Sequence, residues 1–302
     1  MSNAPIPSEH QLYQNYSIEE DAQRSAYHYE QDPRFYYAFT GGEWNVYSCI
    51  LWPEESTTPT EAQAAKLDLM AREMKLEPGK RILDVGCGWG GPLVYLCQKY
   101  GVTGVGITVS AKQRDEAEAR AKKYGVDAQF QLTHWENFSD EKGFDAVYSD
   151  EVIVHFHYLE KFFAHTWNLL KFGGRSVHKE LHYTHSKHTI YERTGEHVQS
   201  VFAFTGNYRL LGEELLMLNN AGFEMVNAIQ IPMENYHRTV EYWLNNLFDN
   251  RDELIELVGE KVWRDFRKYF KIVRRTFSTN AMTLDVVVSQ KIDPKRSENP
   301  EV

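Results

Sequence analysis

The sequence has few cysteines, and their spacing excludes several classes of protein. Only Cys49, Cys87 and Cys97 occur in 302 residues. An odd number of cysteines without Cys-x-x-Cys pairs does not fit a disulfide framework, a zinc ribbon or a dithiol redox centre. We therefore expect reduced thiols in a cytoplasmic protein.

Long apolar runs and a basic leader are also missing. The first residues, MSNAPIPSEH, do not combine basic and apolar residues as a signal peptide does. No apolar run approaches the roughly 20 residues that span a bilayer. The prediction is a soluble protein with no stable insertion in a membrane.

Positive charge is in deficit. The chain has 43 acidic and 33 basic residues and a formal net charge of −10, which argues against nucleic acid as a partner. Hydrophobic residues make up 42% of the chain, enough to build a large core. A small hydrophobic molecule is the expected partner, and the sequence is compatible with a homo-oligomer.

The order of apolar segments predicts an α/β fold. Helical stretches alternate with short apolar runs that suit buried parallel strands. We expect a parallel sheet with helices on both faces, and seven strands at 81–85, 104–107, 129–132, 145–148, 175–181, 223–231 and 283–289. The main domain is predicted over 61–291, with helical cap insertions at about 182–211 and 232–281 and a polar tail at 292–302.

Residues 1–60 are unusually aromatic and are predicted to form a helical extension. Most of their rings suit packing against the main core. Tyr37, Tyr47 and Trp52 are candidates for a lid whose rings face an apolar or cationic ligand. Both roles are open at this stage.

The strongest local signal is the turn Gly86-Cys87-Gly88-Trp89-Gly90 after the first predicted strand. Glycines at alternate positions let the backbone curl and approach a ligand where a Cβ would collide. Asp84 precedes the first glycine by two residues, and no acidic residue closes the second strand. This combination favours S-adenosylmethionine over a nicotinamide cofactor.

Further motifs follow the glycine turn in a fixed order. They are Val46-Tyr47-Ser48-Cys49, LDVGCGWGGP at 83–92, GITVSAKQ at 106–113, His134-Trp135-Glu136, FDAVYSDEVIVHF at 144–156, LLKFGG at 169–174 and Asn235-Tyr236-His237-Arg238-Thr239. In these blocks the chain resembles class I methyltransferases related to cyclopropane fatty acid synthases, over residues 27–290. The resemblance implies the α/β, Rossmann-like fold of class I methyltransferases, a mostly parallel sheet of seven strands with an antiparallel last strand and helical cap insertions. It also implies S-adenosylmethionine as methyl donor.

The resemblance also assigns cofactor contacts. Asp84 supports the turn, Thr108 and Gln113 serve the ribose and amino acid portions, and Trp135 covers the adenine. The full set it implies is Tyr47, Ser48, Asp84, Gly86, Gly88, Thr108, Gln113, Trp135 and Glu136.

Two positions depart from the cyclopropane synthase pattern. Those enzymes resemble one another in a bicarbonate site, of which this chain keeps the Cys at Cys49 and the Tyr at Tyr236. Val154 stands where the family has an acidic residue, and Lys179 where it has a histidine. Cyclopropanation is therefore disfavoured.

Polar residues at two strand ends replace that pattern. His178, Glu180 and His182 alternate along the fifth strand and are predicted to share one face. Glu151 and His155 follow the fourth strand and should converge on the same crevice. We expect Glu180 to act as a base that removes a proton from a carbocation. The same catalytic group is predicted to include Glu151, His155, His178 and Tyr236.

This polar set resembles that of prenyl diphosphate C-methyltransferases, a branch with the same core. Lys179 and Arg209 would bind the diphosphate together with Lys187 and Arg193, and Cys49 would lie at the substrate. Mg²⁺ could be held by Glu151, His155 and His178.

The leading hypothesis is thus C-methylation of an alkene carbon of a prenyl diphosphate in specialised metabolism. A fatty acyl methyltransferase or cyclopropane synthase and a small-molecule N-methyltransferase are the enzyme alternatives. A carrier that binds the cofactor without chemistry is the alternative outside the enzymes.

Overall fold

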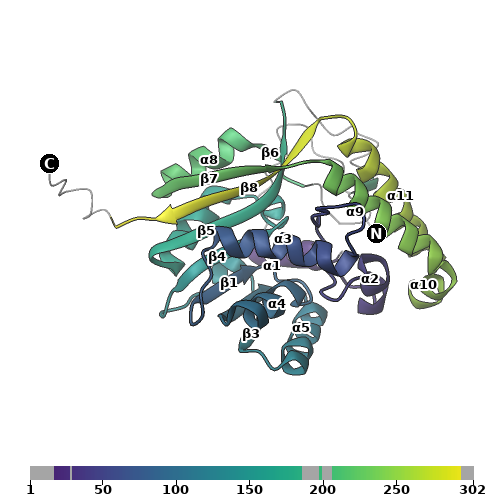
Figure 1. The fold of residues 1–302 in the computed structure, drawn as a ribbon, viewed down its shortest axis with the longest axis horizontal. Helices are drawn as coiled ribbons and strands as arrows, with labels where there is room; N and C mark the ends of the chain where they lie inside the picture. The colour runs from purple at the N-terminus through teal and green to yellow at the C-terminus, as the bar shows by residue number, and fades with distance from the viewer. Residues whose placement is uncertain (1–16, 28, 186–196, 199–205, 294–302) are drawn as a thin grey trace.

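One mixed sheet runs through the molecule, and helices cover both of its faces (Figure 1). The computed structural model describes residues 17–27, 29–185, 197–198 and 206–293. Within these ranges eight strands form the order β3-β2-β1-β4-β5-β8-β7, with the short β6 paired to β5. They are β1 (Arg81–Val85), β2 (Thr103–Thr108), β3 (Ala128–Leu132), β4 (Phe144–Asp150), β5 (Leu170–Tyr183), β6 (Arg209–Leu210), β7 (Phe223–Ile231) and β8 (Met282–Lys291).

The half of the sheet from β3 to β5 is parallel. A parallel pair needs a crossover connection, and helices α4 (Gly91–Tyr100), α5 (Ala111–Tyr124) and α6 (Leu159–Leu169) supply three of them. β8 lies between β5 and β7 and is antiparallel to both. The predicted class of fold, with its antiparallel last strand, is therefore confirmed.

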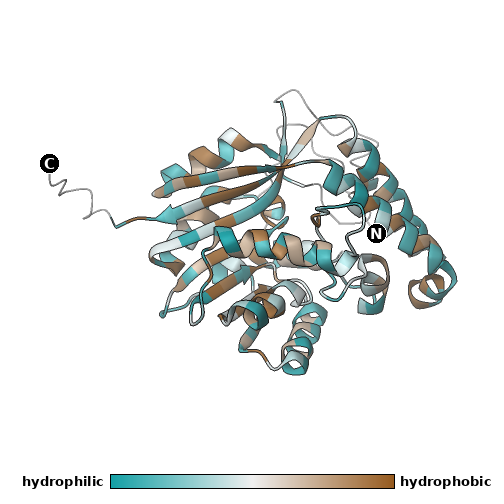
Figure 2. Cartoon of the chain, viewed as in Figure 1, coloured by the Kyte–Doolittle hydropathy of each residue, from teal (hydrophilic) through white to brown (hydrophobic). Residues whose placement is uncertain are grey.

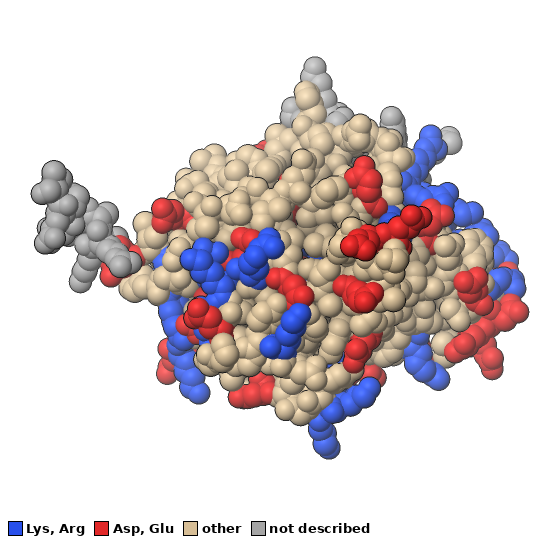
Figure 3. All heavy atoms as spheres, in the orientation of Figure 1, with Lys and Arg blue, Asp and Glu red and all other residues tan. Residues whose placement is uncertain are grey.

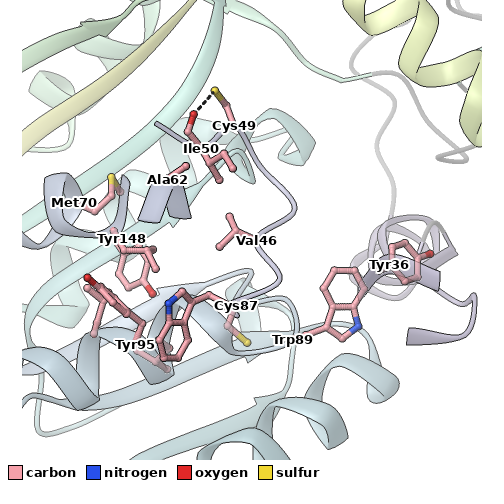
Figure 4. Close-up of a cluster of buried hydrophobic side chains, with 14 of the residues drawn as sticks. Tyr36, Val46, Cys49, Ile50, Ala62, Met70, Cys87, Trp89, Tyr95 and Tyr148 are labelled. Atoms are coloured by element: carbon pink, nitrogen blue, oxygen red, sulfur yellow. Dashed lines mark hydrogen bonds between the residues drawn. The ribbon is translucent and has the colours of Figure 1, made fainter. Parts of the chain in front are cut away.

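The two faces of the sheet belong to two separate cores. Alternate residues of β1 show this, because Ile82 packs in the core under α3 (Pro59–Glu73) and α4, whereas Leu83 packs in the core under α6 and α8 (Leu211–Asn220). Figure 4 shows part of the first core, where Ala62 and Met70 of α3 lie over the sheet.

Four helices form a cap at one end of the sheet: α2 (Pro33–Thr40), α9 (Glu234–Asp249), α10 (Arg251–Val258) and α11 (Glu260–Phe277) (Figure 1). Phe35 of α2 meets Phe266 of α11 with ring centroids 4.8 Å apart, and Phe39 meets Phe270 at 5.2 Å. Two segments that were predicted separately, the aromatic extension and the later insertion, thus pack as one unit. The remaining N-terminal helix, α1 (Ile18–Tyr27), buries none of its residues.

Helix α3 begins after Thr58, because Thr58 and Glu61 form a capping box in which each side chain accepts the other's backbone N–H. The largest difference from a predicted strand boundary is in β5, which begins at Leu170, five residues before the predicted start, and continues to Tyr183. The last residue of β4, Asp150, pairs with Lys179, so the end of β5 extends beyond β4.

The surface is polar and mixed in charge. Hydrophilic residues cover much of α5 and α11 in Figure 2, and acidic and basic side chains are interspersed over the face shown in Figure 3. Among the described helices, none is both long and apolar enough to cross a membrane.

Candidate active site

A cleft opens where β1, β2 and β4 end, and the glycine turn after β1 forms part of it. Gly86, Gly88 and Gly90 have φ angles of +76°, +52° and +75°. The N–H groups of Gly86 and Cys87 both donate to the carbonyl of Ile107 in β2, at 2.9 and 3.0 Å. These bonds hold the turn against the sheet.

The three glycines differ in the space around them. A Cβ at Gly86 would lie 2.6 Å from Cγ1 of Val152, and a Cβ at Gly90 would lie 2.6 Å from Cβ of Ala117. A Cβ at Gly88 would meet no described atom within 4 Å. Gly88 therefore leaves room for a ligand that approaches the backbone.

Buried polar groups line the cleft beside this turn. The hydroxyl of Tyr148 donates to Asp84 at 2.6 Å, and Thr108 donates to the side-chain oxygen of Gln113 at 2.7 Å. Burial raises the pKa of Asp84 to about 7, although the hydrogen bond from Tyr148 opposes the shift. Asp84 thus holds a proton more readily than an exposed aspartate.

Helix α1 forms part of the cleft wall, which the sequence did not reveal. Asp21 and Ser25 of α1 line the cleft, and Asp21 lies 3.2 Å from Nε2 of the His134 imidazole. His134 precedes Trp135, which also lines the cleft and packs against Phe156 with ring centroids 5.4 Å apart. In the sequence, α1 is a short amphipathic helix with many polar residues, and this pattern does not indicate that the helix lines a cleft.

The cleft suits the cofactor that the resemblance implies. The indole Nε1 atoms of Trp89 and Trp135 are buried there without a hydrogen-bond partner among the described residues. Such donors, the open space at Gly88 and nearby carboxylates match a ligand with adenine, ribose and amino acid parts. The predicted contacts that line the cleft are Tyr47, Ser48, Asp84, Gly86, Gly88, Thr108, Gln113 and Trp135. Glu136 is not among the lining residues, and its backbone N–H donates to His134.

A second pocket adjoins the cleft and is called here the acceptor pocket. It encloses about 640 Å³, against about 1050 Å³ for the cleft, and both figures include their open mouths. None of its described lining residues is a lysine or arginine. They are Tyr29, Tyr47, Glu151, Val154, His155, Glu180, Leu181, Val198, Gly206, Tyr208, Tyr236, Trp243 and Tyr269.

Glu151 stands at the junction, because it lines both the cleft and the acceptor pocket. Its φ angle is +58°, a left-handed conformation that is uncommon for residues other than glycine. Its carboxylate accepts hydrogen bonds from the backbone N–H of Cys49 at 2.8 Å, from the Tyr236 hydroxyl and from the Lys179 ammonium. Cys49 and Tyr236, the expected bicarbonate ligands, therefore bind a carboxylate of the chain itself.

Asp150 precedes Glu151 and lines only the cleft. It accepts from the Ser48 hydroxyl and the Lys179 ammonium, both at 2.8 Å, and it forms an ion pair with Lys66. Burial opposes its ionisation, but the two lysines hold the pKa of Asp150 well below its usual range. The sequence analysis did not identify Lys66, although its position in the helix places it among the residues of α3 that are buried.

Glu180 and His155 line the acceptor pocket beside Glu151, and burial shifts the pKa of each. Glu180 accepts the N–H groups of Val154 and Leu181 at 3.0 and 2.9 Å, and burial raises its pKa to about 8. His155 lines both cavities, and burial lowers its pKa to about 4. At neutral pH the Glu180 carboxyl is mostly protonated and the His155 imidazole is neutral.

The histidines of β5 do not join this site. His178 lies on the α6 side of the sheet, where Ser149 and Ser176 hydrogen-bond its two ring nitrogens at 2.7 and 2.6 Å. Burial lowers the pKa of His178 to about 3. His182 lies between Glu214 and Asp285, at 2.8 and 3.0 Å. The alternation was predicted correctly, but only Glu180 of the three reaches a cavity, since the others face packed helix and strand.

The metal and diphosphate predictions also need correction. His178 is separated from Glu151 and His155, and the described residues contain no cluster of three His, Cys, Asp or Glu side chains suited to a metal. Lys179 is fully buried against Asp150 and Glu151, and Arg209 donates to the carbonyls of Phe156 and Asn207. Neither lines the acceptor pocket. Lys187 and Arg193 lie outside the described residues.

Comparisons with known proteins agree with this geometry. Residues 16–287 match the model of the mycolic acid cyclopropane synthetase family. The chain is 30% identical over 264 residues to the methoxy mycolic acid synthase MmaA3 of Mycobacterium tuberculosis, covering 83% of this chain and 88% of that protein. It is 29% identical over 237 residues to the S-adenosylmethionine-dependent methyltransferase UmaA of the same organism, covering 74% and 82%.

A solved structure gives the same picture of the fold. The mycolic acid cyclopropane synthase CmaA1, complexed with S-adenosylhomocysteine and CTAB, superposes with a TM-score of 0.83 at 23% identity, covering 89% of this chain and 98% of that one. The glycine turn, the cleft beside it and the family match over nearly the whole chain lead to one conclusion. The protein belongs to the mycolic acid cyclopropane synthetase family and is an S-adenosylmethionine-dependent methyltransferase.

Proposed function

We propose that this enzyme methylates a double-bond carbon of a fatty acyl chain and then removes a proton from the resulting cation. The observation that carries the proposal is the position of Glu151, a carboxylate that lines both the cofactor cleft and an aromatic acceptor pocket. S-adenosylmethionine supplies an electrophilic methyl group when bound. The residues of the chain supply a dry pocket, a proton acceptor and rings that stabilise positive charge.

The acceptor pocket supports an apolar acceptor. Five tyrosines and a tryptophan contribute to its lining, and none of its described lining residues is a lysine or arginine that could neutralise a phosphate. MmaA3 is named a methoxy mycolic acid synthase and CmaA1 a mycolic acid cyclopropane synthase, and another relative, from Pseudomonas putida, is named a probable fatty acid methyltransferase. An acyl chain therefore fits both the lining and the family better than a prenyl diphosphate does.

We assign proton removal to Glu151 and not to Glu180. Lys179, Tyr236 and Cys49 donate to the Glu151 carboxylate and orient it at the junction of the cleft and the acceptor pocket. Glu180 has a raised pKa of about 8 and is mostly protonated near neutral pH. A carboxylate that three donors hold in place beside both cavities is the better placed proton acceptor.

Product analysis tests the proposal. The purified protein is incubated with S-adenosylmethionine and monounsaturated acyl thioesters, with the saturated thioester as control. We expect S-adenosylhomocysteine release and a product heavier by one CH₂ only with the unsaturated chains. NMR then separates a methyl-branched alkene, which we expect, from a cyclopropane. Cofactor binding without turnover of any acyl alkene would overturn the acyl assignment.

An isoprenoid alkene is the second candidate. The dense aromatic lining favours it, because ring faces stabilise the tertiary cations that branched alkenes form. Prenyl diphosphates with and without Mg²⁺ enter the same assay as separate arms. Turnover in these arms alone would replace the acyl chain by an isoprenoid and leave the methyltransferase chemistry intact.

A further inference from the structure

Lys179 joins the two halves of the active site although it lines neither of them. Its ammonium donates to Asp150, which faces only the cofactor cleft, and to Glu151, which also faces the acceptor pocket. The side chain is fully buried. One lysine thus holds two carboxylates that serve different ligands.

The backbone is shaped to make this contact. Consecutive residues of a strand point to opposite faces, so Asp150 and Glu151 would not normally meet the same cation. The left-handed φ of +58° at Glu151 breaks the alternation directly after β4. A residue other than glycine in this sparsely populated region is strained, and such strain is typical of functional sites.

A second buried lysine acts on one half only. Lys66 of α3 contacts Asp150 and donates to the Ser48 hydroxyl at 2.8 Å, and both of these residues line the cofactor cleft. The two lysines balance the charges of the two carboxylates. Burial lowers the pKa of Lys66, whereas the two carboxylates outweigh burial and raise the pKa of Lys179.

We propose that Lys179 is a positioning residue that couples the cofactor cleft to the acceptor pocket. It holds Glu151 in place relative to Asp150, so a change at one carboxylate is transmitted to the other. The effect on turnover rests on the function proposed above, whereas the effect on cofactor binding does not.

A double-mutant cycle tests the coupling without any acceptor. The affinity for S-adenosylhomocysteine is measured by calorimetry for the wild type, Glu151→Gln, Lys179→Met and the double variant. We expect Glu151→Gln to change the dissociation constant about fivefold or more when Lys179 is present and less than about twofold when it is absent. An equal change in both backgrounds would mean that Glu151 acts on the cofactor directly, and it would overturn the proposal.

Turnover gives a second readout. Lys179→Met should lower kcat about 100-fold while the KM for the cofactor changes little, because Asp150 keeps Lys66. Lys66→Met should raise the cofactor KM more than it lowers kcat, because Glu151 keeps Lys179. Identical effects of the two variants would contradict a distinct coupling role.

Controls separate positioning from folding. Lys291→Met removes another buried lysine, which donates to the carbonyls of Trp167 and Leu170 far from both cavities, and should lower the melting temperature without changing kcat. If Lys179→Met does not fold, Lys179→Gln replaces it in the cycle. If the wild type converts no alkene, the proposed function fails, but the cycle of cofactor affinities still decides the coupling.

Discussion

The cofactor cleft and the acceptor pocket are neighbours, yet they are built in different ways. The cleft is lined mainly by short contiguous motifs at the ends of β1, β2 and β4. The acceptor pocket takes residues from β5, α9, α11 and the segments between them, which are far apart in the chain. Under the function proposed above, the contiguous motifs bind the methyl donor, whereas side chains of the cap contact the acceptor.

The polar residues of β5 also differ in their surroundings. Lys179 holds Asp150 and Glu151 beside the cavities and Glu180 lines the acceptor pocket, whereas His178 and His182 are buried against other polar side chains and line neither cavity. Residues close together on one strand can therefore serve the active site or stabilise the fold, depending on what packs against them.

Glu151→Gln is expected to have the largest effect on turnover. It tests the role assigned to Glu151 between the cofactor cleft and the acceptor pocket. Removal of the proton acceptor should lower turnover by about 10²–10⁴-fold while the dissociation constant for S-adenosylhomocysteine stays within about tenfold. Single-turnover kinetics and calorimetry measure the two quantities. Retained turnover would show that another group, with Glu180 as the first choice, removes the proton.

Glu180→Gln should change how stability depends on pH. The carboxyl pKa is 4.5 in the unfolded reference and about 8 in the folded protein. Between these values the native state keeps a proton that the unfolded state has released, so the free energy of unfolding falls by up to about 1.4 kcal/mol per pH unit as pH rises. This contribution is fully present below about pH 4.5 and is lost by about pH 8.

Urea unfolding at several pH values between 5 and 8 tests this slope, at roughly half-unit steps. As pH rises, the wild type should lose stability relative to Glu180→Gln. A constant difference would mean that Glu180 is ionised in the native state, and it would restore the base role to Glu180.

His178→Leu tests whether the buried histidine of β5 stabilises the fold without taking part in catalysis. The substitution leaves the buried hydroxyls of Ser149 and Ser176 without their histidine partner, and should lower the free energy of unfolding by about 1–3 kcal/mol. Because His178 lines neither cavity, kcat at saturating substrates should be retained below the melting transition. Loss of turnover in a folded variant would return His178 to the active site.

Gly88→Ala tests whether the cofactor approaches the glycine turn, and it has the smallest expected effect. The added Cβ meets no described atom within 4 Å, so the free energy of unfolding should fall only by the cost of a left-handed backbone at alanine, roughly 1–2 kcal/mol. A ligand close to the turn would collide with it, and we expect about tenfold weaker binding of S-adenosylhomocysteine, equal to about 1.4 kcal/mol.

Gly86→Ala is the matched control for that substitution. Its Cβ would press on Val152, so it should destabilise the fold more than Gly88→Ala does, and Val152→Ala should restore part of the loss. Unchanged cofactor affinity in Gly88→Ala would show that the ligand does not approach the turn at this glycine.

Much of the fold and of the cofactor cleft could be read from the sequence, because both depend on local patterns. Short apolar runs and glycines at alternate positions are patterns of a few residues, and they placed β1, β2 and the turn at Gly86. The roles of Lys179 and Arg209 were not predicted. Lys179 donates to two carboxylates and Arg209 donates to backbone carbonyls, but the sequence alone does not distinguish such residues from ligands of a phosphate.

By itself, the sequence determined the parallel strands and the glycine turn, because each depends on residues that are close together in the chain, and its motifs indicated the methyl donor and the antiparallel last strand through the family resemblance. Only the tertiary structure decided that α2 and α11 form one cap, that His178 lines neither cavity and that Glu151 accepts hydrogen bonds from Cys49 and Tyr236. The physical reason is that these contacts join residues distant in the chain, and a left-handed backbone at Glu151 redirects one side chain against the period of its strand.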